Sequence, residues 1–260
     1  MTAANPQRGY LLGLTAYIIW GLFPIYFKAI QAIPALEIIV HRALWSALFG
    51  AALLAVWKHP GWWRELRDNP ARLLVLAGCG LLILGERLRR LQWLAVGLAA
   101  LGVAQQVWQV GSLPWVSLVL ALTFGFYGLI RKKAPVAALP GLVVETWLLL
   151  PIALAWLALH PAAMSNQAAF WSSWQWLLLA AAGPITLVPL VCFNAAARHL
   201  PYTTLGFLQY IAPTLVMLQA IFLFNEHFDP AKLMAFVCIW AGLVVYSLDI
   251  WLSLRGRKAA

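Results

Sequence analysis

The chain has 260 residues, of which 63% are apolar and 10% charged, and its formal net charge is +10. A composition this apolar is typical of an integral membrane protein and excludes an ordinary soluble domain. The basic residues stand in short clusters between apolar runs, the pattern that keeps loops cytoplasmic, so we expect no nucleic-acid partner.

Eight apolar runs are long enough to cross a bilayer, since a helix needs about 20 residues to span its hydrocarbon core. In chain order they occupy 9–31, 35–57, 91–110, 113–131, 136–159, 175–197, 203–224 and 231–253. The first run has no small-residue cleavage site, so we expect it to remain as the first span. These features predict an all-α polytopic membrane protein.

A shorter apolar piece, 73–84, does not fit this series. Its twelve residues would form about 18 Å of helix, and basic clusters flank it on both sides. If it does not cross, the N-terminus, the basic loops and the C-terminus all lie on the cytoplasmic side. We therefore predict a re-entrant or tilted segment, with a spanning helix adjusted to the bilayer as the alternative.

Two pairs of segments indicate an internal repeat. Residues 81–103 align without a gap on 221–243 at an offset of 140. Residues 13–22 align on 120–129 at an offset of 107. Because the offsets differ by 33, the first half lacks about 33 residues that the second half keeps.

The predicted topology inverts the two halves. It places Glu86 inside and its repeat partner Glu226 outside, so the repeats 9–110 and 113–253 have opposite orientations. Inverted repeats are a building principle of secondary transporters, whose substrate path lies near mid-membrane between the halves. With the missing residues, the first half would have five spans, and the complete fold would be five plus five.

Several co-occurring motifs support this interpretation. They are Trp20-Gly21, HRALWS at 41–46, LGERL at 84–88, LPGLVVET at 139–146, GPIT at 183–186 and FNAA at 193–196. Together they resemble the RarD subfamily of the EamA, or drug/metabolite transporter, superfamily over almost the whole chain. The chain departs from that pattern where Gly80 is joined directly to Leu81. The resemblance implies a permease of the bacterial inner membrane and leaves its substrate open.

Ionisable groups within spans are candidates for the substrate path, because a charge near mid-bilayer is costly unless it is paired or hydrated. Arg42 lies in the second span and Glu145 in the corresponding span of the other half. We expect both, together with His41, to line a polar cavity that binds substrate or a coupling proton. The alternative is a structural ion pair or a capped polar contact between the halves.

Uncharged side chains within the spans give further candidates. Trp20 lies deep in the first span, and its ring, like that of Tyr210, is suited to stacking on a ligand. Asn194, in the FNAA motif, is a candidate for lining the cavity. For all three, packing within the bundle is the alternative.

Prolines within spans predict bends, because each leaves a backbone carbonyl without its helical partner. The candidates are Pro24, Gly183, Pro184, Pro189 and Pro213. The motif from Gly183 to Pro189 predicts a bend beside the substrate path, with an ordinary packing kink as the alternative. Two acids, Glu86 and Glu226, are expected to begin the last helix of each repeat, where a negative charge complements the helix dipole.

No phosphate-binding loop, HExxH, GxSxG or paired catalytic carboxylate occurs in the sequence. We therefore expect neither an enzyme nor a bound metal or cofactor. The sequence predicts a secondary permease or exporter that moves a small organic substrate across the lipid bilayer by alternating access. The alternative, from another class, is a truncated remnant or membrane scaffold that no longer transports.

Overall fold

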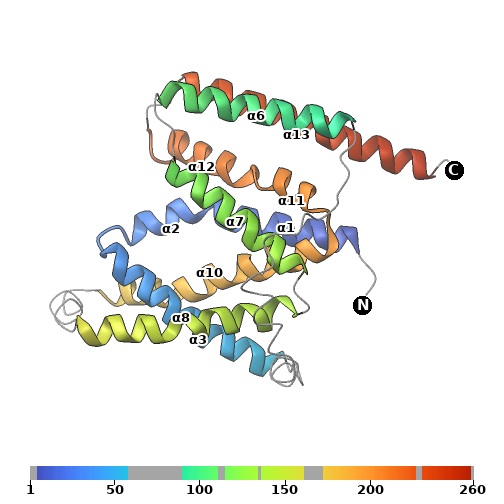
Figure 1. Ribbon diagram of the computed structural model, residues 1–260. Helices are drawn as coiled ribbons and strands as arrows, with labels where there is room; N and C mark the ends of the chain where they lie inside the picture. Colours follow the sequence, from blue (N-terminus) through green and yellow to red (C-terminus); the bar gives the residue numbers. More distant parts are fainter. Residues whose placement is uncertain are drawn as a thin grey trace. The chain divides into compact units, whose positions relative to one another are not determined.

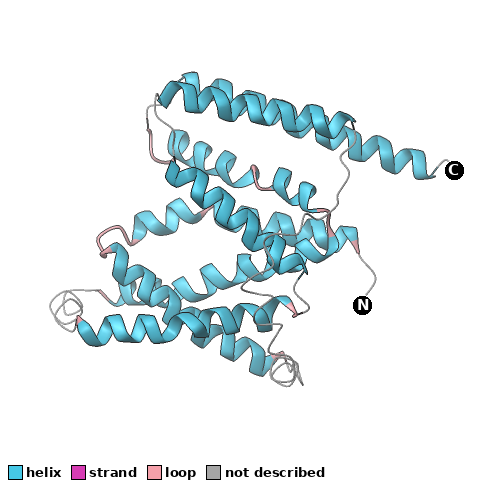
Figure 2. Ribbon diagram, viewed as in Figure 1, coloured by secondary structure: helices cyan, strands magenta, loops and turns pink. Residues whose placement is uncertain are grey.

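The computed structural model describes residues 5–57, 90–110, 115–133, 136–160, 172–226 and 230–258. Every regular element in these ranges is a helix (Figure 2), so the predicted all-α fold is confirmed. The short segment 73–84, the Gly80–Leu81 junction and Glu86 lie outside the described residues. The chain forms two compact units, which we describe separately.

Five helical stretches in the described ranges are long and apolar enough to cross a membrane. They are Pro6–Ala29, Ala35–Val56, Ala138–Leu159, Ser173–His199 and Tyr202–Phe222, and each matches a predicted span. The other predicted spans are helical as well, falling on α6 (Arg90–Val110), α7 (Trp115–Lys133) and α13 (Pro230–Lys258). The protein is therefore a polytopic helical membrane protein.

Unit 1 combines two separate ranges of the chain, Met1–Leu81 and Gly128–Leu200. Its described helices are α1 (Pro6–Gly21), α2 (Phe23–Ala29), α3 (Ala35–Val56), α8 (Ala138–Leu159), α10 (Ser173–His199) and the end of α7 (Figure 1). Helix α10 packs against α1, α3 and α8, and α3 also packs against α8. Most of the candidate site residues are carried by these helices.

The contact between α3 and α10 depends on Gly183. A Cβ at this position would collide with the carbonyl group of Trp45 and lie 2.8 Å from the backbone nitrogen of Ser46. Across the same contact, the Ser46 hydroxyl donates to the Gly183 carbonyl at 3.4 Å. Small residues let membrane helices approach this closely. Helix α10 continues through Pro184 and Pro189, which follow the contact.

Unit 2 comprises Leu82–Tyr127 and Pro201–Ala260. Its described helices are the first part of α7 together with α6, α11 (Tyr202–Leu208), α12 (Ile211–Phe222) and α13. Tyr246 of α13 stacks on Phe207 of α11 with ring centroids 3.9 Å apart. Its hydroxyl also shares a buried hydrogen bond of 2.8 Å with the Thr204 hydroxyl. These contacts join α11 to α13.

Helices α6 and α13 lie side by side (Figure 1), and their contact is reciprocal. A Cβ at Gly102 would lie 2.8 Å from the Ala235 carbonyl oxygen, and one at Gly242 would lie 2.9 Å from that of Ala95. In the sequence repeat, Ala95 aligns with Ala235 and Gly102 with Gly242. The two contacts therefore join positions that are paired in the sequence alignment, and their order along the chain makes the two helices antiparallel.

Two of the membrane-spanning stretches are interrupted near a proline. Between α1 and α2, the N–H of Leu22 donates to the carbonyls of Ile18 and Ile19 at 3.0 and 3.1 Å. Pro24, in the first turn of α2, has no N–H with which to continue the helical ladder. In unit 2, α11 ends before Tyr210, and Pro213 lies in the first turn of α12.

Candidate functional site

Arg42 is a half-buried cation on α3, seven residues after the helix begins. Its Nε donates to the Thr186 hydroxyl of α10 at 3.1 Å. No carboxylate of the described residues forms an ion pair with it. The guanidinium has five N–H donors, so one hydrogen bond to a hydroxyl leaves donors available to an anionic ligand.

Glu145 of α8 has a different cationic partner from the one expected. Its Oε1 lies 3.5 Å from Nη1 of Arg131, whose side chain is 2% exposed whereas that of Glu145 is 31% exposed. Nη2 of Arg131 also donates to the Ala138 carbonyl at 2.7 Å. A Cβ at Gly141 would lie 2.9 Å from the Arg131 Cζ, so the glycine makes room for the guanidinium. For Glu145, the geometry fits the structural ion pair.

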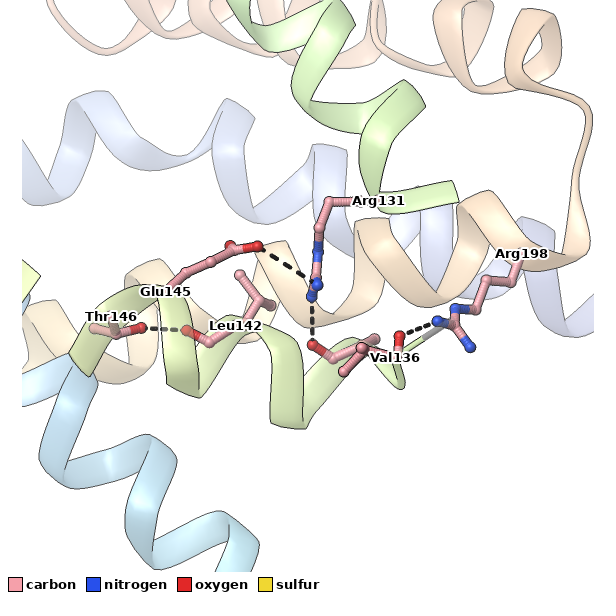
Figure 3. Close-up of polar contacts among 7 residues, drawn as sticks. Arg131, Val136, Leu142, Glu145, Thr146 and Arg198 are labelled. Atoms are coloured by element: carbon pink, nitrogen blue, oxygen red, sulfur yellow. Dashed lines mark hydrogen bonds and ion pairs between the residues drawn. The ribbon is translucent and has the colours of Figure 1, made fainter. Parts of the chain in front are cut away.

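Further contacts join several chain segments near this ion pair, at one end of unit 1. Arg198, at the end of α10, donates to the Val136 carbonyl (Figure 3). Lys132 donates to the Leu200 carbonyl at 3.2 Å, and a Cβ at Gly9 would lie 2.7 Å from the Leu200 Cγ. The start of α1 therefore lies at the same end of unit 1 as the basic segments near 132 and 198.

Trp20 belongs to an aromatic cluster between α1 and α10. Its ring centroid lies 5.5 Å from that of Tyr17 and 5.7 Å from that of Phe193. The Tyr17 and Phe193 side chains are each 1% exposed, whereas Trp20 is half-buried. Asn194, the next residue of α10, is also only 1% exposed. The cluster packs the two helices together and leaves part of the Trp20 ring accessible.

His41 and Tyr210 lie in different units. His41 is 5% exposed, and its ring meets the Trp176 ring of α10 edge-on, with centroids 5.7 Å apart. Tyr210 precedes α12 as its N-cap residue and belongs to unit 2. The structure therefore gathers Trp20, His41, Arg42, Glu145 and Asn194 in unit 1, and Tyr210 stands apart from this set.

Sequence reasoning did not single out three residues that the structure makes prominent. Arg131 appeared only as part of a basic loop, although it is buried against Glu145. Thr186, the partner of Arg42, stands in the GPIT motif. Glu37 is an acid with 3% exposure, and its spacing of four from His41 was a signal that both lie on one face of α3.

The position of Glu226 differs from the expectation that it begins the last helix. Helix α13 begins at Pro230, four residues later. The backbone N–H of Glu226 donates to the Ala220 carbonyl of α12 at 2.8 Å, and the residue is exposed. Glu226 is therefore associated with the end of α12 in the described part of the chain.

Known proteins resemble this chain over nearly its full length. It is 64% identical to an uncharacterized transporter of Pseudomonas aeruginosa, covering 98% of each chain. The profile of the EamA-like transporter family matches residues 113–248. The chain belongs to the EamA-like transporter family. Within this family it belongs to the RarD subfamily, being 39% identical to protein RarD of Escherichia coli, with 96% of this chain and 97% of that protein covered.

A solved crystal structure shares the fold of this EamA protein. It matches with a TM-score of 0.57 at 18% identity, covering 94% of this chain and 98% of the other. Family and fold together identify a multi-pass membrane protein of a transporter family, as the sequence motifs predict.

The comparison also bears on the shortfall that the repeat offsets predict. The alignment with the P. aeruginosa transporter runs over 292 residues, whereas this chain has only 260. At least 32 residues of that relative therefore have no counterpart here. This number agrees with the shortfall of about 33 residues obtained from the two repeat offsets.

Proposed function

We propose that this EamA-family protein is a secondary transporter of small organic anions or zwitterions in the bacterial inner membrane, with both termini cytoplasmic. The observation that carries the proposal is the position of Arg42, a cation inside a membrane-spanning stretch. Among the described residues, its hydrogen-bond partner is the neutral hydroxyl of Thr186. A buried charge is retained in a membrane protein mainly where it serves a pathway or a partner. A carboxylate or phosphate of the substrate would satisfy its remaining donors.

The surroundings of Arg42 support a substrate contact at this position. Thr186 follows Gly183 and Pro184 on α10, and at Gly183 the backbones of α3 and α10 approach closely. Pro184 cannot donate to the carbonyl four residues earlier, which leaves backbone acceptors at membrane depth where protein or a ligand can use them. We place Arg42 and Thr186 at the substrate, and Glu145 in the ion pair with Arg131.

Alternating access is the second part of the proposal. The halves 9–110 and 113–253 would form the two inverted repeats between which access changes. The reciprocal contacts of Gly102 with Ala235 and of Gly242 with Ala95 support this arrangement, because they have the antiparallel symmetry of inverted elements. In this mechanism the substrate site opens alternately to the two sides of the membrane. The uptake assay below tests whether substrate crosses in this way.

The test combines a binding screen with a flux measurement. Purified protein is screened for small anions and zwitterions that raise its unfolding temperature, and the hits are assayed for gradient-driven uptake into proteoliposomes. Arg42→Ala should strongly reduce uptake at low substrate concentration, and Arg8→Ala, which changes an exposed arginine, should not. Equal uptake by wild type and Arg42→Ala at equal protein levels would contradict the assignment of Arg42.

The second candidate function is a transport-incompetent remnant or scaffold, which is favoured by the missing residues of the first repeat. The matched experiment compares this chain with a version in which the absent segment of the P. aeruginosa relative is restored. Uptake by both forms would exclude the remnant. Uptake by the restored form alone would show that the shortened chain has lost transport.

A further inference from the structure

Glu37 is a buried acid that the proposed substrate contact does not use. It lies in the first turn of α3, at one end of the apolar stretch Ala35–Val56, and its side chain is 3% exposed. No donor among the described residues is within hydrogen-bond distance of its Oε2. Burying an unpaired carboxylate is far more costly than burying the neutral acid. The environment of Glu37 therefore favours a bound proton.

Two ordinary structural roles do not account for this acid. A first-turn acid can cap its helix, but α3 has no side-chain capping hydrogen bond, and its N-cap residue is Pro34. An acid can also pair with a nearby cation, but no ion pair joins Glu37 to Arg42 or to another cation of the described residues. Within the described part of the chain, neither a cap nor an ion pair stabilises a charged Glu37.

Few titratable groups lie near the start of α3 on the elements packed against it. Helix α2 carries Tyr26, whose hydroxyl donates to the backbone of α10, and Lys28, which is exposed. Helix α8 is followed by His160, which is exposed. Residues 173–186 of α10 include no acidic or basic side chain. Besides His41 and Arg42 of α3 itself, these are the titratable groups that the described residues of those elements place near Glu37.

A face of α3 continues from Glu37 towards the contact with α10. His41, one turn further, is 5% exposed, and Trp45, another turn on, has a buried Nε1 with no acceptor among the described residues. Residues four apart lie on the same side of a helix. The backbone of Trp45 meets Gly183. An acid, an imidazole and an indole N–H thus follow one another from the end of the span to the helix crossing.

We propose that Glu37 binds the coupling proton of the transport cycle and that His41 is the next group on its path. The proposal rests on the proposed transport function. In the conformation described here the carboxylic acid holds its proton. Release breaks only the O–H bond, and the proton passes to water or His41 when a change of conformation exposes the carboxylate.

The first test is infrared spectroscopy of the full chain in lipid at pH 7, with protein made by cell-free synthesis from glutamate labelled with carbon-13 at its side-chain carboxyl. We expect the infrared band of a protonated carboxyl group, with its frequency shifted by the carbon-13 label. Glu37→Gln should remove it, whereas Glu226→Gln, which changes an exposed acid, should leave it intact. Absence of the band from the wild type, or its persistence in Glu37→Gln, would overturn the proposal.

A second variant covers the case in which Glu37→Gln does not fold. In Glu37→Asp the proton would sit on an unlabelled aspartate, so the band should remain but lose its isotope displacement. A band that is still displaced by labelled glutamate would show that another glutamate binds the proton, and it would contradict the assignment.

The coupling role is tested by a pH jump applied to the protein on a supported membrane without added substrate. Proton binding should give a transient charge displacement in wild type and in Glu226→Gln, reduced at least tenfold in Glu37→Gln. An unchanged transient in Glu37→Gln would refute the coupling role. Since neither measurement needs substrate, a protein that shows the band but takes up no compound would contradict the transport function alone.

Discussion

Arg42 of α3 donates to the hydroxyl of Thr186 on α10 at 3.1 Å, within a few residues of the point where the two helix backbones meet. This bond holds a cation from one half of the chain against the proline-containing helix of the other half. The same contact between helices therefore brings together Arg42 and the segment of α10 that contains Pro184, which were singled out separately from the sequence.

Replacing Arg42 or Thr186 is expected to weaken substrate binding to different extents. Arg42→Ala removes a charge-assisted contact worth about 1.5–3 kcal/mol, so affinity should fall roughly 10- to 100-fold. Thr186→Val keeps the cation and removes only its positioning bond, so the loss should be smaller. Titration of a screened ligand against each purified variant measures the effect. A larger loss in Thr186→Val than in Arg42→Ala would contradict the assigned roles.

Gly183→Ala is expected to lower the free energy of unfolding by about 1–3 kcal/mol. The added Cβ would collide with the backbone of α3, and backbone cannot rotate away as a side chain can. Chemical unfolding in detergent micelles measures the change. The control is Gly206→Ala on α11, where no atom lies within 4 Å of the added Cβ. Equal stability of the two variants would show that the helices can separate at no cost.

Glu145→Gln is expected to lower stability by about 1–3 kcal/mol, because it leaves the buried Arg131 without its carboxylate. The double variant Arg131→Gln with Glu145→Gln should be less destabilised than the sum of the single variants. Glu226→Gln serves as the control because that acid is exposed. Strict additivity of the two substitutions would argue against a stabilising pair.

Gly102→Ala and Gly242→Ala are expected to destabilise the protein by similar amounts, about 1–3 kcal/mol each. The reason is that each Cβ would press on a backbone carbonyl, at 2.8 and 2.9 Å respectively. Gly97→Ala on the same helix, α6, is the control, since nothing lies within 4 Å of its added Cβ. A large effect at one glycine and none at the other would refute the reciprocal contact.

The sequence alone was sufficient to predict the class, the family and the positions of the long apolar helices of this protein. Each crossing must bury about 20 apolar residues whatever its neighbours are, so span positions follow from local composition. The interruption after α1 was also foreseeable at Pro24, because a missing N–H acts within one turn of helix. The size of the length difference from the P. aeruginosa relative was likewise predictable by counting aligned positions, without coordinates.

Only the tertiary structure showed how the charged side chains are matched. Sequence placed Arg42 and Glu145 in corresponding spans and offered them as a pair, but the structure pairs Glu145 with Arg131 and Arg42 with Thr186. The structure also shows that Glu37 is buried and that, among the described residues, it has neither a capping role nor an ion pair. The partner of a long side chain depends on which helix faces meet and how closely. How closely two helices approach is determined by backbone contacts between residues far apart in the chain, such as the contact of Gly183 with Trp45.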